Sequence, residues 1–98
     1  HKGEKIEDEA LLKQAQLLES QEKYEAAELN YIKIIEFYGS GILADDAYFA
    51  LGELYRKILA QPDRAKVQYE KIIYNYQDSY YFPQARKNFR MLRGDAVN

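Results

Sequence analysis

The 98-residue chain contains no cysteine, and its only histidine is His1 at the amino terminus. Disulfide bonds and thiol chemistry are therefore excluded, and so are zinc sites built from cysteine and histidine. A nucleophilic triad of the Ser-His-Asp or Cys-His kind needs an internal histidine, which this chain does not have. The sequence argues against an enzyme, and it predicts neither a metal site nor a cofactor.

Long apolar runs and an excess of basic charge are also missing. No run approaches the roughly 18–20 apolar residues that a membrane-spanning helix requires, so direct membrane insertion is not expected. The net charge is −2, which argues against a general nucleic-acid binder. A phosphate-binding loop is not predicted, because Gly39-Ser40-Gly41 is too short and follows a predicted helix rather than a strand.

What the sequence does contain is an internal repeat with an offset of 38 residues, in which Ala27 to Tyr38 recurs as Ala65 to Tyr76. Residues 47–54 recur in the same way as residues 85–92. A fixed period of this size is typical of helical repeat arrays, which usually bind other proteins. The apolar positions of the first segment follow one helix face: Ala27, Tyr31, Ile34, Ile35 and Tyr38.

The same periodicity predicts five helices, and the short connections predict that neighbouring helices are antiparallel. We expect Gly39-Ser40-Gly41 to end the second helix, because glycine accepts the left-handed conformation past a helix end. Pro62 suits the first turn of the fourth helix, Asp78 and Ser79 are candidate caps of the fifth, and Gly94 fits just past its end. The predicted helices span, to within a few residues, 6–19, 23–37, 43–59, 63–75 and 81–93.

The repeat resembles the tetratricopeptide repeat, a helix–turn–helix unit. Leu51-Gly52, followed by Tyr55, Ala65 and Tyr69, is similar to that family's pattern of Leu-Gly, Tyr, Ala and an aromatic residue. In the family, the small residue lets the paired helices approach closely. A looser first copy precedes this one, and a third copy consists only of its first helix.

The resemblance implies one all-α domain over residues 1–98, in which antiparallel helix pairs stack as an α-α superhelix. Repeat 1 would occupy about residues 6–38 and repeat 2 about residues 43–76, followed by a capping helix at about 80–93 and a tail at 94–98. Asn88 departs from the pattern, because apolar Ala50 stands at that position one copy earlier, and this departure argues against a fully regular superhelix. Apolar residues of the first helix, including Ile6, would need cover, so we expect the chain to be the C-terminal part of a longer array.

The resemblance also implies a binding surface, because in this family the first helix of each pair lines an inner groove that receives peptides. Leu12, Phe49 and Met91 would form an apolar stripe there with a charged rim, which suits an extended or helical peptide. The family's clamp for acidic C-terminal peptides is predicted to be absent, since other residue types hold its Lys and Asn positions. The alternative is that these apolar residues contact neighbouring repeats or the chain's own termini. The predicted lining is Leu12, Gln16, Glu19, Phe49, Glu53, Arg56, Lys57, Lys87 and Met91.

Two further features bear on partners. Ten tyrosines are present; those at repeat positions, such as Tyr31 and Tyr69, are expected to pack while keeping their hydroxyls in water. Tyr48, Tyr74, Tyr80 and Tyr81 are extra aromatic residues, which suit either a protein-binding surface or rim packing between helices. The basic residues of the last helix suit an acidic partner or another repeat, although cations are ordinary at a helix end: Arg86, Lys87, Arg90 and Arg93.

Two hypotheses of function follow. The first is a non-catalytic interaction scaffold that binds a protein or peptide partner in the groove. The second is a structural spacer that self-associates without a groove ligand, because residues 1–53 carry a net charge of −7 and residues 54–98 one of +5. The compartment is not known from composition. Residues 76–85 resemble the linker of bacterial cell-envelope repeat proteins, and the C-terminal end is similar to repeat proteins of Bacteroidetes-type bacteria, which implies the periplasm or outer membrane.

Overall fold

A computed structural model describes residues 4–94, with side chains described from Glu7 onward, and it has five helices and no strand in that range. The helices are α1 (Glu4–Ser20), α2 (Tyr24–Tyr38), α3 (Ala44–Lys57), α4 (Pro62–Asn75) and α5 (Phe82–Arg93). This confirms the all-α helical-repeat prediction. The side chain of Ile6, and the predicted tail apart from Gly94, lie outside the described residues. None of the described helices is long and apolar enough to cross a membrane.

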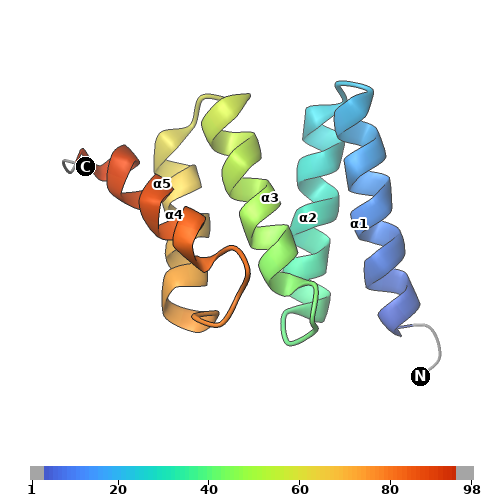
Figure 1. The fold of residues 1–98 in the computed structure, drawn as a ribbon. Helices are drawn as coiled ribbons and strands as arrows, with labels where there is room; N and C mark the ends of the chain where they lie inside the picture. The colour runs from blue at the N-terminus through green and yellow to red at the C-terminus, as the bar shows by residue number, and fades with distance from the viewer. Residues whose placement is uncertain (1–3, 95–98) are drawn as a thin grey trace. The chain divides into compact units, whose positions relative to one another are not determined.

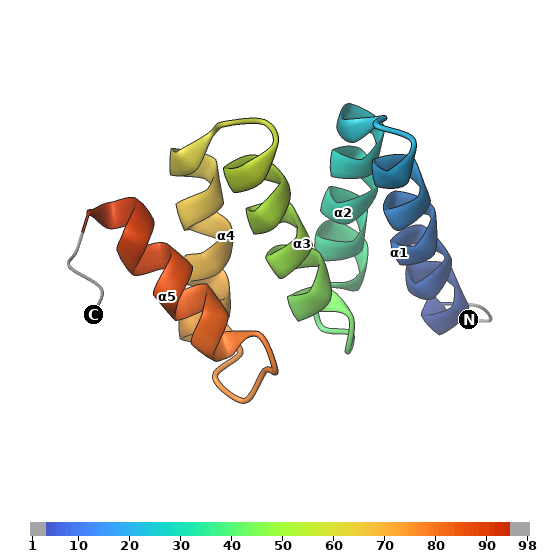
Figure 2. The same cartoon turned by 45° about the horizontal axis from the view of Figure 1, so that its top comes forward.

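The chain divides into two compact units, residues 1–47 and 48–98, with the boundary inside α3. In the first unit, α1 and α2 run side by side in opposite directions, as both views show (Figure 1, Figure 2). Ala15 of α1 and Ala27 of α2 are fully buried, and small side chains of this kind leave room for two packed helices to approach closely. Tyr31 and Ile34 complete the core of this helix pair.

The second unit contains most of α3 together with α4 and α5, and its core holds Leu51, Leu54 and Ile72. Gly52 of α3 faces the ring of Tyr69 on α4. A Cβ atom on Gly52 would lie 2.6 Å from Cε1 of Tyr69, far inside ordinary van der Waals contact. The expectation that the small residue of the Leu-Gly pair permits close helix approach is therefore confirmed in atomic terms. α5 packs against α4 along the other side of the unit (Figure 1).

The predicted helix ends are correct in place, but two of the proposed mechanisms are wrong. Gly39 follows α2 with φ −63°, in the right-handed region; a Cβ there would instead meet the Ile35 carbonyl oxygen at 2.6 Å. Neither Asp78 nor Ser79 caps α5, whose N-cap is Tyr81 without a side-chain hydrogen bond. The Ser79 hydroxyl accepts from the Tyr81 N–H in the preceding turn, at 3.0 Å.

The other ends behave as expected. Pro62 lies in the first turn of α4, where its missing N–H leaves no hydrogen bond unmade. Gly94 ends α5 in the left-handed region at φ 92°, and its N–H donates to the carbonyls of Arg90 and Met91. α3 stops at Lys57 rather than Leu59, because Ala60 turns the chain at φ 53°.

Candidate functional site

The nine predicted groove residues fall into two sets that belong to different units. Leu12, Gln16 and Glu19 lie on α1 of the first unit, and the other six lie on α3 and α5 of the second. Within the second set, Glu53 pairs with Arg56 and Lys57. A groove that runs through all nine residues therefore remains a prediction.

On α1, the three residues share one helix face at i, i+4 and i+7. Leu12 is half-buried and Gln16 is exposed. Glu19 is engaged within the unit, because its carboxylate accepts the hydroxyl hydrogen bond of Tyr31 from α2. Burial, together with that bond to Glu19, raises the pKa of Tyr31 well above its usual value.

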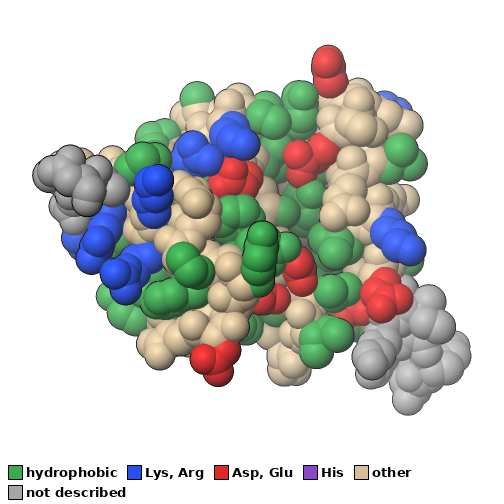
Figure 3. All heavy atoms as spheres, viewed as in Figure 1, with side chains coloured by type: hydrophobic (Ala, Val, Ile, Leu, Met, Phe, Trp, Pro, Cys, Tyr) green, Lys and Arg blue, Asp and Glu red, His purple; other side chains and the backbone are tan. Residues whose placement is uncertain are grey.

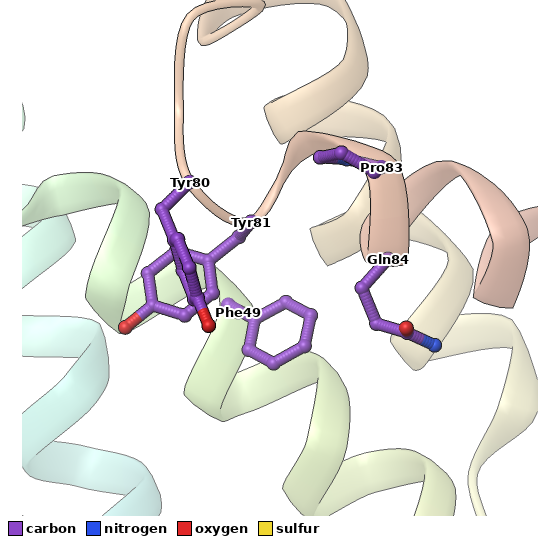
Figure 4. Close-up of a pocket in the computed structure, with 5 residues that line it drawn as sticks. All are labelled: Phe49, Tyr80, Tyr81, Pro83 and Gln84. Carbon is purple, nitrogen blue, oxygen red and sulfur yellow. The ribbon is translucent and has the colours of Figure 1, made fainter.

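Phe49 of α3 is the centre of an aromatic cluster. Its ring stacks on that of Tyr81, with centroids 4.6 Å apart and planes inclined by 15°, and Tyr80 meets Tyr81 edge-on at 5.4 Å. With Pro83 and Gln84 at the start of α5, these side chains line a pocket of about 420 Å³ (Figure 4). We call this the aromatic pocket. Tyr80 is 90% exposed, so its ring is open to contact with another molecule.

One helical turn further along α3, Glu53 organises a polar network. Its Oε1 lies 2.8 Å from Nη2 of Arg56 and 3.4 Å from Nζ of Lys57. Its Oε2 accepts from the Tyr69 hydroxyl at 2.7 Å and from Nδ2 of Asn88 at 3.0 Å. The Glu53 carboxylate therefore connects α3 with Tyr69 on α4 and Asn88 on α5. Its role is structural, and it is not a solvated charge at the rim of the groove.

The network also accounts for the departure at position 88 and corrects one expectation. Asn88 is 1% exposed, and it donates to Glu53 while its Oδ1 accepts from Nε2 of Gln84 at 2.9 Å. The hydroxyls of Tyr31 and Tyr69 do not reach water, because both side chains are buried and bonded to glutamates. A buried polar group with both partners satisfied fixes the position of a helix instead of weakening it.

The network also shifts the pKa values of two of its members, Tyr69 and Arg56. Burial is the largest influence on Tyr69 and, with the bond to Glu53, raises its pKa to about 12. Burial alone would lower the pKa of the Arg56 guanidinium, but its bond to Tyr69 and the charge of Glu53 outweigh burial and raise that pKa above its usual value. Arg56 is thus a fixed cation at neutral pH.

The remaining predicted residues are accessible. Lys57, Lys87 and Met91 are all exposed. On α5, Lys87 follows Gln84 by three positions and Met91 follows Lys87 by four, so the three lie along one helix face. That face begins at the aromatic pocket. Arg and Lys side chains gather over α5 in the space-filling view (Figure 3).

The chemistry that this arrangement supports is recognition. Within residues 7–94, no group of three or more His, Cys, Asp or Glu side chains is placed to hold a metal ion. The charged side chain nearest the centre of the unit, Glu53, is already compensated by cations and donors. An open aromatic pocket beside exposed cations is typical of a surface that binds another chain.

Comparison with protein families gives one match, to the tetratricopeptide repeat family over residues 46–79. This range contains the Gly52–Tyr69 contact and the α3–α4 turn. The match covers about a third of the chain and supports a tetratricopeptide repeat in this range. Comparisons with curated proteins and with solved structures give no significant match. Tetratricopeptide repeats are in general non-catalytic modules for binding proteins, and this repeat carries Phe49, Glu53, Arg56 and Lys57 on its first helix.

The predicted groove lining did not include Tyr80, Pro83 or Gln84, although Tyr80 was named among the extra aromatic residues that suit either a protein-binding surface or rim packing. All three line the aromatic pocket: Tyr80 lies in the connection after α4, whereas Pro83 and Gln84 lie in the first turn of α5 (Figure 4). One signal was present: Tyr80 and Tyr81 were aromatic residues without a repeat position. Helical periodicity cannot assign a partner to residues in a connection, since a turn has no repeating face.

Proposed function

We propose that the chain is a non-catalytic interaction module that binds a protein or peptide partner through the surface shared by α3 and α5. The observation that supports this is the aromatic pocket, where Phe49 and Tyr81 stack and Tyr80 stands exposed beside them. Rigid aromatic side chains lose little conformational entropy on binding and are enriched at the centres of protein interfaces. The Glu53 network supports the proposal further, because it fixes α5 against α3 before any partner arrives.

The remaining predictions belong to the same proposal. They are that residues 1–98 act as one domain within a longer array, and that Leu12, Gln16 and Glu19 extend the surface along α1. The linker's resemblance to bacterial cell-envelope repeat proteins makes the envelope the first compartment in which to look for the partner.

Partner capture with matched variants tests the proposal. The domain would be used to capture proteins from an extract, followed by quantitative mass spectrometry, with Phe49→Glu and Tyr80→Glu as test variants. Tyr74→Glu is the control, since Tyr74 is 69% exposed on α4 and lies outside the aromatic pocket. A partner kept by Tyr74→Glu and lost by both test variants, with unchanged circular dichroism, is the expected result. Equal capture by all four proteins would rule out this surface.

Self-association is a second candidate, and the uneven charge favours it. Residues 1–47 carry 11 acidic and 5 basic side chains, whereas residues 48–98 carry 5 acidic and 9 basic. Opposite charges at two ends favour head-to-tail contact between copies. Sedimentation velocity over a hundredfold concentration range would then show a mass that rises with concentration and falls with added salt. A monomer throughout would exclude this candidate.

A further inference from the structure

A buried carboxylate in the first unit has no compensating group. Asp8 of α1 is 3% exposed, and its Oδ1 is buried without a hydrogen-bond partner. Among the side chains that the structure describes, no Lys or Arg forms a salt bridge with Asp8. Burying a carboxylate without a donor or a cation beside it is strongly unfavourable. A positively charged group that reached Asp8 would therefore stabilise the folded domain.

The second oxygen of this carboxylate faces Gly41, in the turn that follows α2. A Cβ atom on Gly41 would lie 3.3 Å from Oδ2 of Asp8 and 3.1 Å from the carbonyl oxygen of Tyr38. Both oxygens therefore border the position that the missing side chain of Gly41 leaves open. The Tyr38 hydroxyl donates to Oε1 of Glu7 at 3.1 Å, which holds this end of α1 beside the end of α2 (Figure 1).

The open position lies at the negative end of a helix. α2 ends at Tyr38, so the Tyr38 carbonyl is one of the last four of the helix, which have no partner within it. These carbonyls carry the partial negative charge of a helix C-terminus, and α2 has no basic residue in its last turn to offset that charge. A carboxylate beside a helix C-terminus is repelled by it unless a cation lies between them.

The second copy of the repeat has a side chain where the first copy has none. The 38-residue offset aligns Asp8 with Asp46, and it aligns Gly41 with Ser79. In both copies the N–H of the glycine or serine donates to the carbonyl three positions earlier, at 2.8 Å and 2.9 Å, so the two turns are built alike. Neither Asp46 nor Ser79 is without a partner. The first copy therefore keeps the carboxylate and lacks the hydroxyl.

We propose that the open position beside Gly41 binds a hard metal cation, for which Ca²⁺ is the best match. Ca²⁺ takes its ligands from carboxylates, backbone carbonyls and water, in a flexible geometry. Asp8 supplies the carboxylate, Tyr38 supplies the carbonyl, and water completes the coordination. With a single carboxylate the affinity is at the weak end for calcium sites, with a Kd of the order of 1 mM. The site lies outside the aromatic pocket, so its failure would leave the proposed function untouched.

Thermal unfolding followed by circular dichroism tests the binding of Ca²⁺ at constant ionic strength. Calcium chloride at about 10 mM is expected to raise the Tm by about 5 °C. Magnesium chloride should raise it by less than half as much, because Mg²⁺ gives up its water reluctantly. Asp8→Asn should abolish the calcium effect and raise the Tm without calcium, since the uncompensated charge is gone. Glu9→Gln, which removes an exposed carboxylate of α1, is the matched control and should keep the calcium effect.

Two substitutions of Gly41 test the open position itself. Gly41 is outside the left-handed region, so a side chain there introduces no backbone strain. Gly41→Ala fills the position with a methyl group and should abolish the calcium effect. Gly41→Ser reproduces the second copy, so it should also abolish the calcium effect, and it should raise the Tm without calcium because its hydroxyl can donate to Asp8.

Luminescence of Tb³⁺, which replaces Ca²⁺ at oxygen sites, locates the ion because a nearby tyrosine transfers its excitation energy to the bound Tb³⁺. Tyr38→Phe is expected to reduce this luminescence, and Tyr76→Phe, at the corresponding position of the second copy, should leave it unchanged. Equal effects of the two substitutions would contradict the location.

Three results of the unfolding experiment would overturn the inference. They are a Tm of the unmodified domain that does not depend on calcium, a calcium effect that survives Asp8→Asn, and a calcium effect that survives Gly41→Ala. Lys5 precedes Asp8 by one helical turn, and its side chain lies outside the described residues. A Tm that calcium does not change and that Lys5→Gln lowers would assign the Lys5 ammonium to Asp8 in place of a metal ion.

Discussion

Replacing Gly52 with alanine tests how the repeat packs. The added Cβ would lie 2.6, 2.9 and 3.0 Å from three ring carbons of Tyr69, which is fully buried. Overpacking of this kind in a well-packed core costs about 1–3 kcal/mol. Alanine in a helix interior returns about 0.5–1 kcal/mol relative to glycine. Gly52→Ala is therefore expected to lower the free energy of unfolding by roughly 1–2 kcal/mol.

A double-mutant cycle isolates the interaction energy between position 52 and the ring of Tyr69. In a Tyr69→Leu background the ring is gone, so Gly52→Ala should be neutral or stabilising by up to about 1 kcal/mol. The coupling between the two sites is then about 2 kcal/mol, within the range measured for contacting residues. Urea unfolding followed by circular dichroism at 222 nm gives all four free energies. Exposed Ala26→Gly on α2 provides the propensity term on its own.

The sign of the change in unfolding free energy caused by Gly52→Ala distinguishes a packing role of this glycine from helix propensity alone. If Gly52→Ala stabilises the unmodified protein by the amount that Ala26→Gly destabilises it, helix propensity alone explains the glycine. Equal effects of Gly52→Ala in the two backgrounds would likewise show that Tyr69 does not press against α3.

Three other perturbations have defined outcomes. Asn88→Asp places a second carboxylate beside Glu53 and should destabilise the domain by about 1–3 kcal/mol, with hydrogen exchange increasing first in α5; unchanged exchange there would contradict the bridging role. Because burial raises the pKa of Tyr69 to about 12 from about 10 in the unfolded chain, the stability held below pH 10 should be lost as the pH rises toward 12. Tyr69→Phe should reduce that alkaline loss in thermal unfolding, and an identical pH profile would refute the assignment. Gly94→Ala forces a residue with a side chain into the left-handed region at φ 92°, which should lower the free energy of unfolding by about 1 kcal/mol. Hydrogen exchange in the last turn of α5 should increase, and unchanged exchange there would contradict the role of Gly94 in ending the helix.

The helices could be predicted because their signals are local and periodic. The 38-residue offset and the apolar face from Ala27 to Tyr38 identify helix pairs without any knowledge of the third dimension. The backbone conformation at each helix end depends on contacts between a few neighbouring residues. Gly39 was correctly placed at the end of α2, but no residue pattern reveals its right-handed conformation or the Ile35 carbonyl oxygen that a Cβ at this position would meet.

The polar contacts could not be predicted in the same way. Glu53 and Asn88 are 35 residues apart, and their pairing depends on how α5 rotates about its axis when it packs. From the sequence, Glu53 was predicted to line the groove, and Asn88 was identified only as a departure from the repeat pattern. A polar residue at an apolar repeat position is equally consistent with a buried partner, and only the packed structure distinguishes the two. The aromatic pocket was missed for the same reason, since the connection carrying Tyr80 has no periodic face.

Site-specific photo-crosslinking tests the central claim most directly, because it reports contact with a partner at a chosen residue. A benzophenone amino acid would be introduced at Tyr80, in the aromatic pocket, and separately at Tyr74 on α4, in the full-length protein in its native cells. Our account predicts a discrete crosslinked partner from position 80 and none from position 74. No crosslinked partner at position 80, or the same products from both positions, would contradict the claim that this surface binds a partner protein.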